Sequence, residues 1–581
     1  MRGGSQDDHT QCSIPADSIP SNPDAKSKAS QDPHAIPEPT LNPRKSLAES
    51  LLTRCNTLLT ELDAFKALLS QTQRNPQIVE VRSLRSNILA ELKTLEKISG
   101  QLDAAIAVTE GVRRRIRVRE QQGGNSDGVG DGQYQNELID AEEAEIKLMH
   151  TLRSSNLPFY EAVWTIAKRT CTGLVAFGKR FYWDGEQREG SANKNKDKRK
   201  SVFVDIVADD GEEWVKVSTI SETRLLFEMA KKGWEGDSED EDEDREKRTV
   251  LQNHSHGSGS DYDDEDEDDD DEIELIKLAS DMRKAASLVR VNYKQPRLRF
   301  VIPKVEEGQT PEIDDLLKAI RGYGVIVNCG EDVSSSEASG DPRACTVSIE
   351  EEVRNLLPNR FKRFTSTVNI DCTLLLAIIS DLSHYQSISP SPRHHKAINR
   401  QIEIERERPL LPTELWPAME SRELICTSEA AKRMREIVDI IGTETERTRM
   451  AILMGDNSFS GLKSASLTEE LQKLSDYQVP VHLNLPIKTV DAQVAIDLGK
   501  QQGKLPPVAQ RVEEILSDIN TSVFMYGWVS QLMTISSNRT VVKQIETTIE
   551  MQRDVEDLEG PLVWVCDTAR SLIGKEKGRK N

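Results

Sequence analysis

An acidic run in the middle of the chain places the strongest constraint on how this sequence can fold. Between residues 235 and 274 there are 21 acidic and 3 basic residues, so this stretch alone carries a formal charge of −18. Side chains of like charge repel one another, and the run has little apolar surface to bury. We therefore predict a solvated, extended insertion at 235–273, with folded parts before and after it.

The remaining residues are close to neutral. The whole chain of 581 residues has a formal charge of −22, which leaves about −4 outside the acidic run. Hydrophobic residues make up only 36% of the sequence, so folded domains are expected to alternate with disordered segments, of which the polar residues 1–45 are one. The acidic run has three open interpretations: a site for a basic protein, a mimic of nucleic acid, or a solubilising spacer.

Eight singly spaced cysteines and a polar N-terminus indicate a reducing compartment. No CxxC occurs, and no cysteine lies at zinc-binding spacing from a histidine. The N-terminus lacks the apolar core of a secretory signal, and no run of about 18 apolar residues could span a bilayer. We expect a cytoplasmic or nuclear protein without a membrane partner.

The first half of the chain is predicted to be largely helical. Apolar residues recur at helical spacing within 46–120, with Pro76 between two segments, which indicates a helical hairpin. A Gly-rich linker at 121–135 leads to a small α/β lobe at 136–234, where SVFVDIVADDGEEWVKVST has the pattern of a β-hairpin. The basic end of the helical hairpin, RRRIRVR at 113–119, is either a nucleic-acid contact or a solvated helix terminus.

Strands and helices alternate in the second half. Residues 274–330 read as a helix followed by a strand–helix–strand unit, which favours a parallel pair of strands. The alternation continues through 331–581, where NTSVFMYGWVSQLMTI is predicted as a strand leading to a helix and GPLVWVCDTARSL as a strand ending at Asp567. This pattern is typical of an α/β domain with a mostly parallel sheet.

One aspartate stands at a junction of strand and helix in the stretch VNIDCTLLLAIISDLSH, residues 368–384. Aspartate is a favoured N-cap, because its carboxylate accepts a backbone N–H and suits the positive end of the helix dipole. Residues at the carboxyl ends of parallel strands also face the crevice in which α/β proteins bind ligands. Asp371 is therefore a helix cap, a ligand-binding acid, or both.

Three blocks of the sequence carry a resemblance to a known family. They are SVFVDIVADDGEEWVKV, VNIDCTLLLAIISDLS and LPTELWPAMESRELICTSEAAKRMREIVDIIGTETERTRMAIL. With these blocks the chain resembles the uncharacterised, UPF0415-like family whose C-terminal half is called domain of unknown function 1308. That half is similar in pattern to PIN-like nuclease domains, so the resemblance implies a PIN-like, three-layer α/β domain at 331–581.

The resemblance also implies a set of site residues. PIN-like nucleases hold one or two Mg²⁺ or Mn²⁺ ions with several carboxylates, and the metal activates water for attack on a phosphodiester. The first acid of the pattern falls on Asp371, and a small hydroxyl that follows it falls on Thr373. The position of the second acid falls on Arg433, with Glu429 and Glu436 one turn to either side.

The third acid of the pattern falls on Trp528. Neither Trp528 nor Arg433 can ligate a hard cation, so the pattern is incomplete as aligned. Either the alignment slips and other acids complete the site, or the site is degenerate. The acids available to complete it are Glu429, Glu436, Asp518 and Asp567, and the expected metal ligands are Asp371 and Asp567.

A second group of charges lies in the predicted β-hairpin. Asp205 on one strand, with Glu213 and Lys216 on the next, resembles the acid–acid–lysine constellation of restriction-like nucleases. However, Glu213 and Lys216 are one residue too far apart, and Trp214 stands where the acid would be. The alternative is a hairpin with exposed charges and Trp214 in the core.

Other enzyme motifs give no support to a different activity. The sequence has no GxxxxGK[ST], GxSxG or HExxH. The leading hypothesis is an RNA-linked ribonuclease that depends on Mg²⁺ or Mn²⁺ and whose site is either complete or degenerate. The other is a non-catalytic interaction scaffold, in which the helical hairpin recruits a partner and the acidic run binds a basic protein.

Overall fold

The computed structural model describes most of the chain. The described residues are 43–73, 76–121, 129–183, 200–232, 272–330, 348–392, 394–552, 558–566 and 569–573. Most of the predicted polar segment 1–45 and of the acidic insertion 235–273 lies outside these residues, and so does Asp567.

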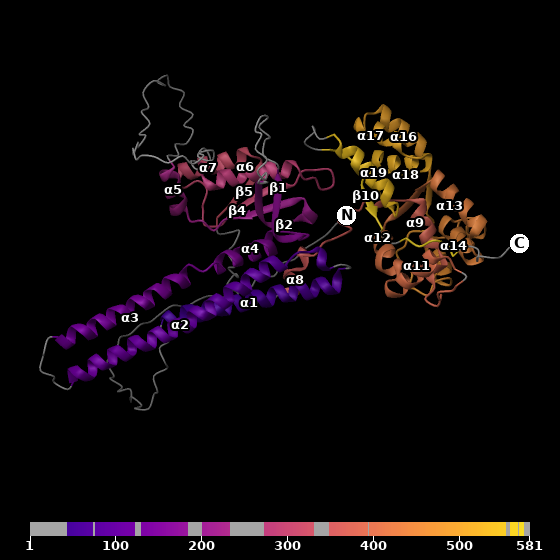
Figure 1. The fold of residues 1–581 in the computed structure, drawn as a ribbon. Helices are drawn as coiled ribbons and strands as arrows, with labels where there is room; N and C mark the ends of the chain where they lie inside the picture. The colour runs from indigo at the N-terminus through magenta and orange to yellow at the C-terminus, as the bar shows by residue number, and fades with distance from the viewer. Residues whose placement is uncertain are drawn as a thin grey trace, which may run out of the picture.

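Four helices open the described chain. They are α1 Pro43–Thr72, α2 Arg82–Gln121, α3 Val129–Arg153 and α4 Leu157–Thr170. Figure 1 shows α2 and α3 running side by side away from the rest of the molecule. The helices form because their apolar residues recur on one face and bury together, as Phe65 of α1 and Leu95 of α2 do.

The linker predicted at 121–135 is shorter than expected, because α3 already begins at Val129. Ion pairs extend the contact between α2 and α3 toward their shared tip. Arg113 pairs with Glu142 at 2.6 Å, and Arg115 pairs with Glu137 at 3.4 Å. Two of the five arginines in the basic run at 113–119 are therefore paired with acidic side chains of α3.

A five-stranded mixed sheet follows these helices. Its strands are β1 Ala176–Trp183, β2 Lys200–Ala208, β3 Glu213–Val217, β4 Arg297–Ile302 and β5 Val325–Cys329. They lie in chain order; β1–β2 and β2–β3 are antiparallel, and β3–β4 and β4–β5 are parallel. The predicted β-hairpin and the predicted parallel pair are confirmed as β2–β3 and β4–β5. The sequence analysis misses β1, whose residues do not alternate cleanly between buried and exposed.

Helices cover both faces of this mixed sheet. On one face α1, α2 and α4 share a core with the sheet that includes Trp164, Phe177 and Val215. On the other face the core includes Phe300 and Leu316. The helices of that second face are α5 Glu222–Lys231, α6 Glu274–Ser287 and α7 Pro311–Gly322.

The segment after β5 returns to the first half before the chain crosses to the second. Helix α8, Ile349–Glu352, leads to Val353 and Leu356, which are buried in the core beneath α1 and α4. The backbone N–H of Leu174 donates to the carbonyl of Leu356 at 2.8 Å. Val353 and Leu356 lie after the predicted domain boundary at residue 331, yet they belong to the core of the first half.

The second half is built on an all-parallel sheet. Its strands are β6 Thr367–Ile370, β7 Glu423–Thr427, β8 Lys488–Val490, β9 Met533–Ser536 and β10 Val563–Val565. They lie in the order β10-β9-β6-β7-β8, and every neighbouring pair is parallel. This sheet confirms the predicted α/β class with a parallel sheet in the second half.

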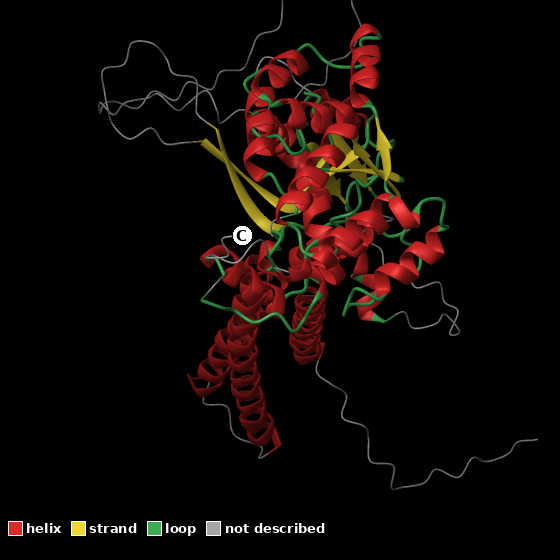
Figure 2. Cartoon of the chain, turned by 90° about the vertical axis from the view of Figure 1, so that its right-hand side faces the viewer, coloured by secondary structure: helices red, strands yellow, loops and turns green. Residues whose placement is uncertain are grey.

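Helices surround this second sheet, and Figure 2 shows them in front of its strands. The longer ones are α9 Cys372–Ile379, α11 Lys396–Glu407, α13 Ser428–Ile441, α14 Glu444–Met454, α15 Ser464–Gln472, α16 Ala492–Gln501, α17 Val508–Ile515, α18 Asp518–Val529 and α19 Arg539–Glu550. This half also contains two one-turn helices, α10 Asp381–His384 and α12 Trp416–Met419. One apolar core joins the helices to the strands, as a buried parallel sheet requires.

One prediction in this half is wrong in its order. The stretch NTSVFMYGWVSQLMTI is a helix leading to a strand, α18 followed by β9, and not a strand leading to a helix. Both elements are largely buried, so apolar residues occur on all sides of each and periodicity does not separate helix from strand. The reversed order moves Trp528 from a strand end to the last turn of a helix.

A tyrosine of the first half packs into the second. Tyr293 has φ +72°, contacts the core of the second half, and accepts a hydrogen bond at its carbonyl from the N–H of Leu558 at 3.2 Å. Its ring lies directly over Gly560, where it leaves no room for a Cβ atom. Lys362 and Asp209 form an ion pair.

We predict that Gly560→Ala lowers the free energy of unfolding by about 1–3 kcal/mol, because a Cβ must displace the Tyr293 ring. The matched control is Gly100→Ala in α2, where nothing lies within 4 Å of a new Cβ. That change should raise stability by about 1 kcal/mol through helix propensity. Urea unfolding of both variants checks the pair of signs, and a Gly560→Ala protein as stable as the wild type would contradict the contact.

Candidate functional site

Asp371 lies at the point in the second sheet where the order of strand addition reverses. The chain places β7 and β8 on one side of β6, and then β9 and β10 on its other side. Ligands of open α/β sheets bind outside the carboxyl ends of the strands at such a switch point. Asp371 follows β6 directly, and its backbone N–H donates to the carbonyl of Ile535 in β9 at 3.0 Å.

The Asp371 carboxylate is closed off by two hydroxyl groups. Ser536 at the end of β9 and Thr373 in α9 each donate a hydrogen bond to Oδ2 of Asp371 at 2.6 Å. The two hydroxyls are held in turn, because the N–H of Asn538 donates to Ser536 Oγ and the N–H of Ser537 donates to Thr373 Oγ1. Asp371 is only 2% exposed, so its carboxylate bridges the two sides of the switch point inside the protein.

Burial sets the charge preference of this carboxyl. Loss of solvent raises the pKa of Asp371 above its ordinary 3.8, and the hydroxyls of Ser536 and Thr373 oppose that rise. The backbone N–H groups of Cys372 and Thr373 also favour the charged form. Asp371 occupies the N-cap position of α9, but its side chain makes no regular capping hydrogen bond.

Two of the predicted acids lie on α13, beside this edge. Glu429 is in the first turn after β7, is partly buried, and has an Oε2 atom that is buried and has no hydrogen-bond partner among the described residues. Glu436 is exposed and pairs with Arg433 at 3.2 Å. The Arg433 charge is close enough to Cys372 to oppose the effect of burial, which raises the pKa of that thiol to about 12. Glu429 is therefore the better placed of the two acids.

The two remaining candidates, Asp518 and Trp528, lie at opposite ends of helix α18. Its N-terminal end is at the same edge as Asp371, because the hydroxyls of Ser522 and Thr427 lie 3.1 Å apart. Asp518 is exposed at this end of the helix. Trp528 is in the last turn, close to the start of β9 and thus at the opposite edge. The assignment of the third acid to Trp528 is wrong, because the order of helix and strand was reversed.

The described residues do not gather a metal site. No group of three or more His, Cys, Asp or Glu side chains among them is arranged to hold a metal ion. The predicted ligand Asp567 belongs to the undescribed residues, so Asp371 is the one predicted metal ligand that the structure places. With its Oδ2 occupied by two hydroxyls, this carboxylate acts as a polar bridge between β6 and β9.

The sequence analysis misses Ser536, which is half of that bridge. The signal was present as TISS at 534–537, a strand ending in hydroxyls. Because the strand was placed too early in the chain, this signal could not be aligned with Asp371.

The three residues of the restriction-like pattern, Asp205, Glu213 and Lys216, do not come together in the structure. Lys216 Nζ lies 3.2 Å from Oδ2 of Asp205, and the N–H of Val217 donates to the same carboxylate at 2.8 Å. Glu213 instead faces Arg299 at 3.2 Å. Trp214 is buried and stacks on Phe181, as expected for a core residue. The Asp205–Lys216 pair therefore closes the end of the β2–β3 ladder without a second acid.

One family model matches the part of the chain that contains Asp371. Residues 368–472 match the family described as Protein of unknown function (DUF1308). The DUF1308 match runs from β6 to α15 and includes Asp371, Thr373, Glu429 and Glu436. No solved structure matches this chain. Among the described helices, none is both long and apolar enough to cross a bilayer.

We predict that Ser536→Ala lowers the free energy of unfolding by about 1–3 kcal/mol, because it leaves a buried carboxylate without one of its two hydroxyl donors. The matched control is Ser537→Ala, whose backbone and not its hydroxyl holds Thr373. That change should stay within about 0.5 kcal/mol of the wild type. Urea unfolding followed by tryptophan fluorescence measures both, and equal losses at the two serines would contradict the bridge.

The raised pKa of Asp371 also predicts a pH dependence. A group with a higher pKa in the folded than in the unfolded protein binds more protons when folded, so its contribution to stability falls as pH rises between the two values. The Asp371→Asn variant lacks this titration. The unfolding free energy of Asp371→Asn minus that of the wild type should increase as pH rises from about 3.8. This difference should become constant above the pKa of Asp371 in the folded protein. A relative change in favour of the wild type over the same range would contradict the direction of the shift.

Proposed function

We propose that this protein is a non-catalytic interaction scaffold whose C-terminal domain has the plan of a PIN-like nuclease without a complete metal site. The observation that carries the proposal is the closed environment of Asp371. A metal-binding carboxylate must keep an oxygen for the cation. The Asp371 side chain is buried, and its Oδ2 is taken by the hydroxyls of Ser536 and Thr373, which leaves only Oδ1 for a cation.

The sheet supports the PIN-like part of this proposal. Counted along the chain, the parallel strands lie in the order third, second, first, fourth and fifth. The acid of the first strand is at the switch point, and a threonine follows two residues later, as the resemblance implies. Arg433 occupies the position of the second acid and is exposed near that edge.

The projecting helices support the scaffold part. Four apolar side chains are exposed where α2 and α3 run beside each other: Val108 is 57% exposed, Val118 47%, Ile139 51% and Ile146 59%. Exposed apolar side chains on a projecting element offer another protein a surface to bury, although only side chains that adjoin one another form a binding patch. In this proposal the projecting pair recruits a partner, and the acidic run provides a second contact for a basic protein.

A ribonuclease remains the second candidate, and one observation favours it. Glu429 has a buried carboxylate oxygen without a partner among the described residues, at the edge that also carries Asp371. Together with Asp567, which is outside the described residues, Asp371 and Glu429 would form a donor set of the kind that Mg²⁺ or Mn²⁺ prefers. RNA would be the substrate in that case.

Cleavage of single-stranded RNA in Mn²⁺ by the full chain tests the two candidates. We expect no cleavage by the wild type or by Asp371→Asn, with both proteins folded by circular dichroism. Cleavage that is present in the wild type, lost in Asp371→Asn and retained in Glu469→Gln, an exposed acid of α15, would overturn the scaffold and establish the ribonuclease.

The same proteins allow a positive test of the scaffold. Crosslinking in cells should recover a set of partners that Asp371→Asn keeps and that the double change Val118→Asp with Ile139→Asp loses. The matched control is Phe227→Asp, which alters a 73% exposed side chain on α5. Recovery of the same partners from the double variant would contradict a role for the projecting helices.

A further inference from the structure

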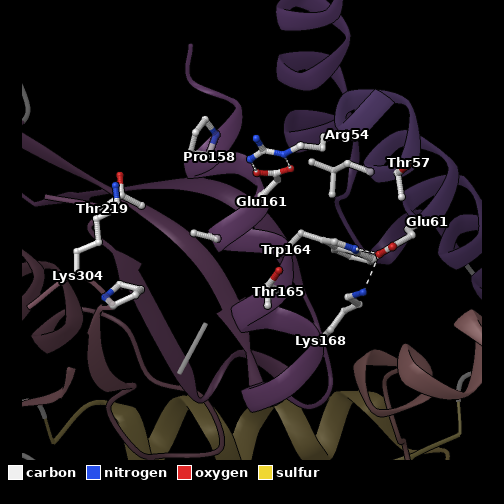
Figure 3. A pocket seen from close by; sticks show the side chains of 13 residues that line it. Arg54, Thr57, Glu61, Pro158, Glu161, Trp164, Thr165, Lys168, Thr219 and Lys304 are labelled. Atoms are coloured by element: carbon white, nitrogen blue, oxygen red, sulfur yellow. Dashed lines mark hydrogen bonds and ion pairs between the residues drawn. The ribbon is translucent and has the colours of Figure 1, made fainter. Parts of the chain in front are cut away.

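A cavity in the first half of the molecule is separate from the Asp371 edge. It is an open cleft of about 660 Å³ between α1, α4 and the loops that follow β3 and β4 (Figure 3). This volume is within the range of small-molecule sites, and the carboxyl ends of neighbouring parallel strands are a common place for them. The cavity therefore has the size and the position of a ligand site.

The helical wall of the cavity carries two sets of ion pairs. Arg54 of α1 faces Glu161 of α4, with Arg54 Nε donating to Oε1 of Glu161 at 2.8 Å and Nη2 donating to Oε2. Glu61 of α1 accepts through one oxygen, Oε2, from the indole N–H of Trp164 at 2.6 Å and from Lys168 at 2.7 Å. These contacts fix the charged groups in place before any ligand arrives.

The facing wall is formed by Thr219, Pro303 and Lys304. Figure 3 shows Thr219 and Lys304 across the cavity from Arg54 and Glu161. Lys304 is exposed and forms no hydrogen bond or ion pair with a described residue. Its ammonium group is therefore available to a ligand in the cavity.

A count of donors and acceptors indicates the charge of that ligand. Both oxygens of Glu161 are occupied by Arg54, which retains N–H groups beyond the two that it uses. Lys168 donates to Glu61 and, at 3.2 Å, to Glu352, and an ammonium group has a third donor. Lys304 adds three more. The lining thus contains three cationic and two anionic side chains, and its unused groups are mainly donors.

We propose that this cavity binds the phosphate group of a small phosphorylated molecule, with Lys304 and Arg54 as its charged contacts and the Thr219 hydroxyl as a further donor. Phosphate fits better than carboxylate, because its oxygens point in several directions and the donors come from both walls, whereas a carboxylate has only two oxygens. The rest of the volume accommodates the organic part of the molecule. The proposal does not depend on the function assigned to the Asp371 edge.

Isothermal titration calorimetry with the full chain tests the proposal at constant ionic strength. The probes are inorganic phosphate, a hexose 6-phosphate, a nucleoside 5′-monophosphate, the two parent compounds without phosphate, and a dicarboxylate. We expect saturable binding of a phosphorylated probe, competition by inorganic phosphate, and no binding of the parent compounds. Binding of the dicarboxylate alone, or of none of the phosphorylated probes, would overturn the proposal.

Variants then locate the site. Lys304→Ala should weaken binding of the phosphorylated probe about tenfold or more, because it removes a charged contact. Arg54→Lys should weaken it as well, because an ammonium group cannot hold Glu161 and reach the ligand with the planar fork of arginine. The matched control is Lys97→Ala, which removes an exposed lysine of α2 and should leave the affinity unchanged.

Two further outcomes would count against the proposal. Equal affinity of Lys304→Ala and the wild type would place the binding elsewhere on the protein. Displacement of the small probe by a short RNA at lower concentration than by inorganic phosphate would assign the cavity to a nucleic-acid backbone instead. Circular dichroism of each variant shows whether it remains folded, so a loss of binding can be separated from a loss of structure.

Discussion

A polar seam joins β6 and β9, and the second half of the molecule is built around it. Asp371 and Ser536 are 165 residues apart in the sequence, yet their side chains meet at 2.6 Å. One step deeper, Asn369 donates to the hydroxyl of Thr534 at 3.1 Å. All four side chains are buried, and a buried polar group without a partner costs free energy. The amide N–H group of Asn369 is bonded, whereas its Oδ1 has no partner among the described residues. These polar pairs favour the observed register, in which Asn369 lies opposite Thr534.

The seam also determines how closely α18 approaches the sheet. Asn369 donates a second hydrogen bond to the carbonyl of Val523 at 2.9 Å. At Gly527 the helix passes so near to Thr534 that a Cβ atom has no space. The two halves of the molecule meet at the other end of these strands, where Tyr293 covers Gly560 just before β10. The contact between the halves is thus at the amino ends of the strands. Tyr293 does not cover the carboxyl ends, where Asp371 lies.

Elements with short-range signals could be predicted from the sequence. Three such elements are the β2–β3 hairpin, the β4–α7–β5 unit and the junction at Asp371. Each has its sequence signal within about 30 residues: alternating apolar residues, a glycine at a turn, or a capping residue. The candidate Asp371 was found for the same reason, and its place at the end of β6 is as expected.

The rest of the site depends on contacts that no local pattern contains. Ser536 matters because β9 pairs with β6, and Trp528 drops out because α18 carries it to the far edge. The partner of Asp205 is Lys216 and not Glu213, because the paired strands place Asp205 and Lys216 side by side. Such facts follow from the strand order and the register, which are decided by burial over the whole domain.

The central position of β6 has a consequence for how the chain folds as it is made. During synthesis β6 and β7 emerge long before β9, whose last residue lies 165 positions after Asp371. Until β9 arrives, one side of β6 is an unpaired edge with buried apolar residues at 368 and 370, and such edges pair readily with other chains. A chain that ends before Met533 would therefore carry a sheet that is open at its central strand.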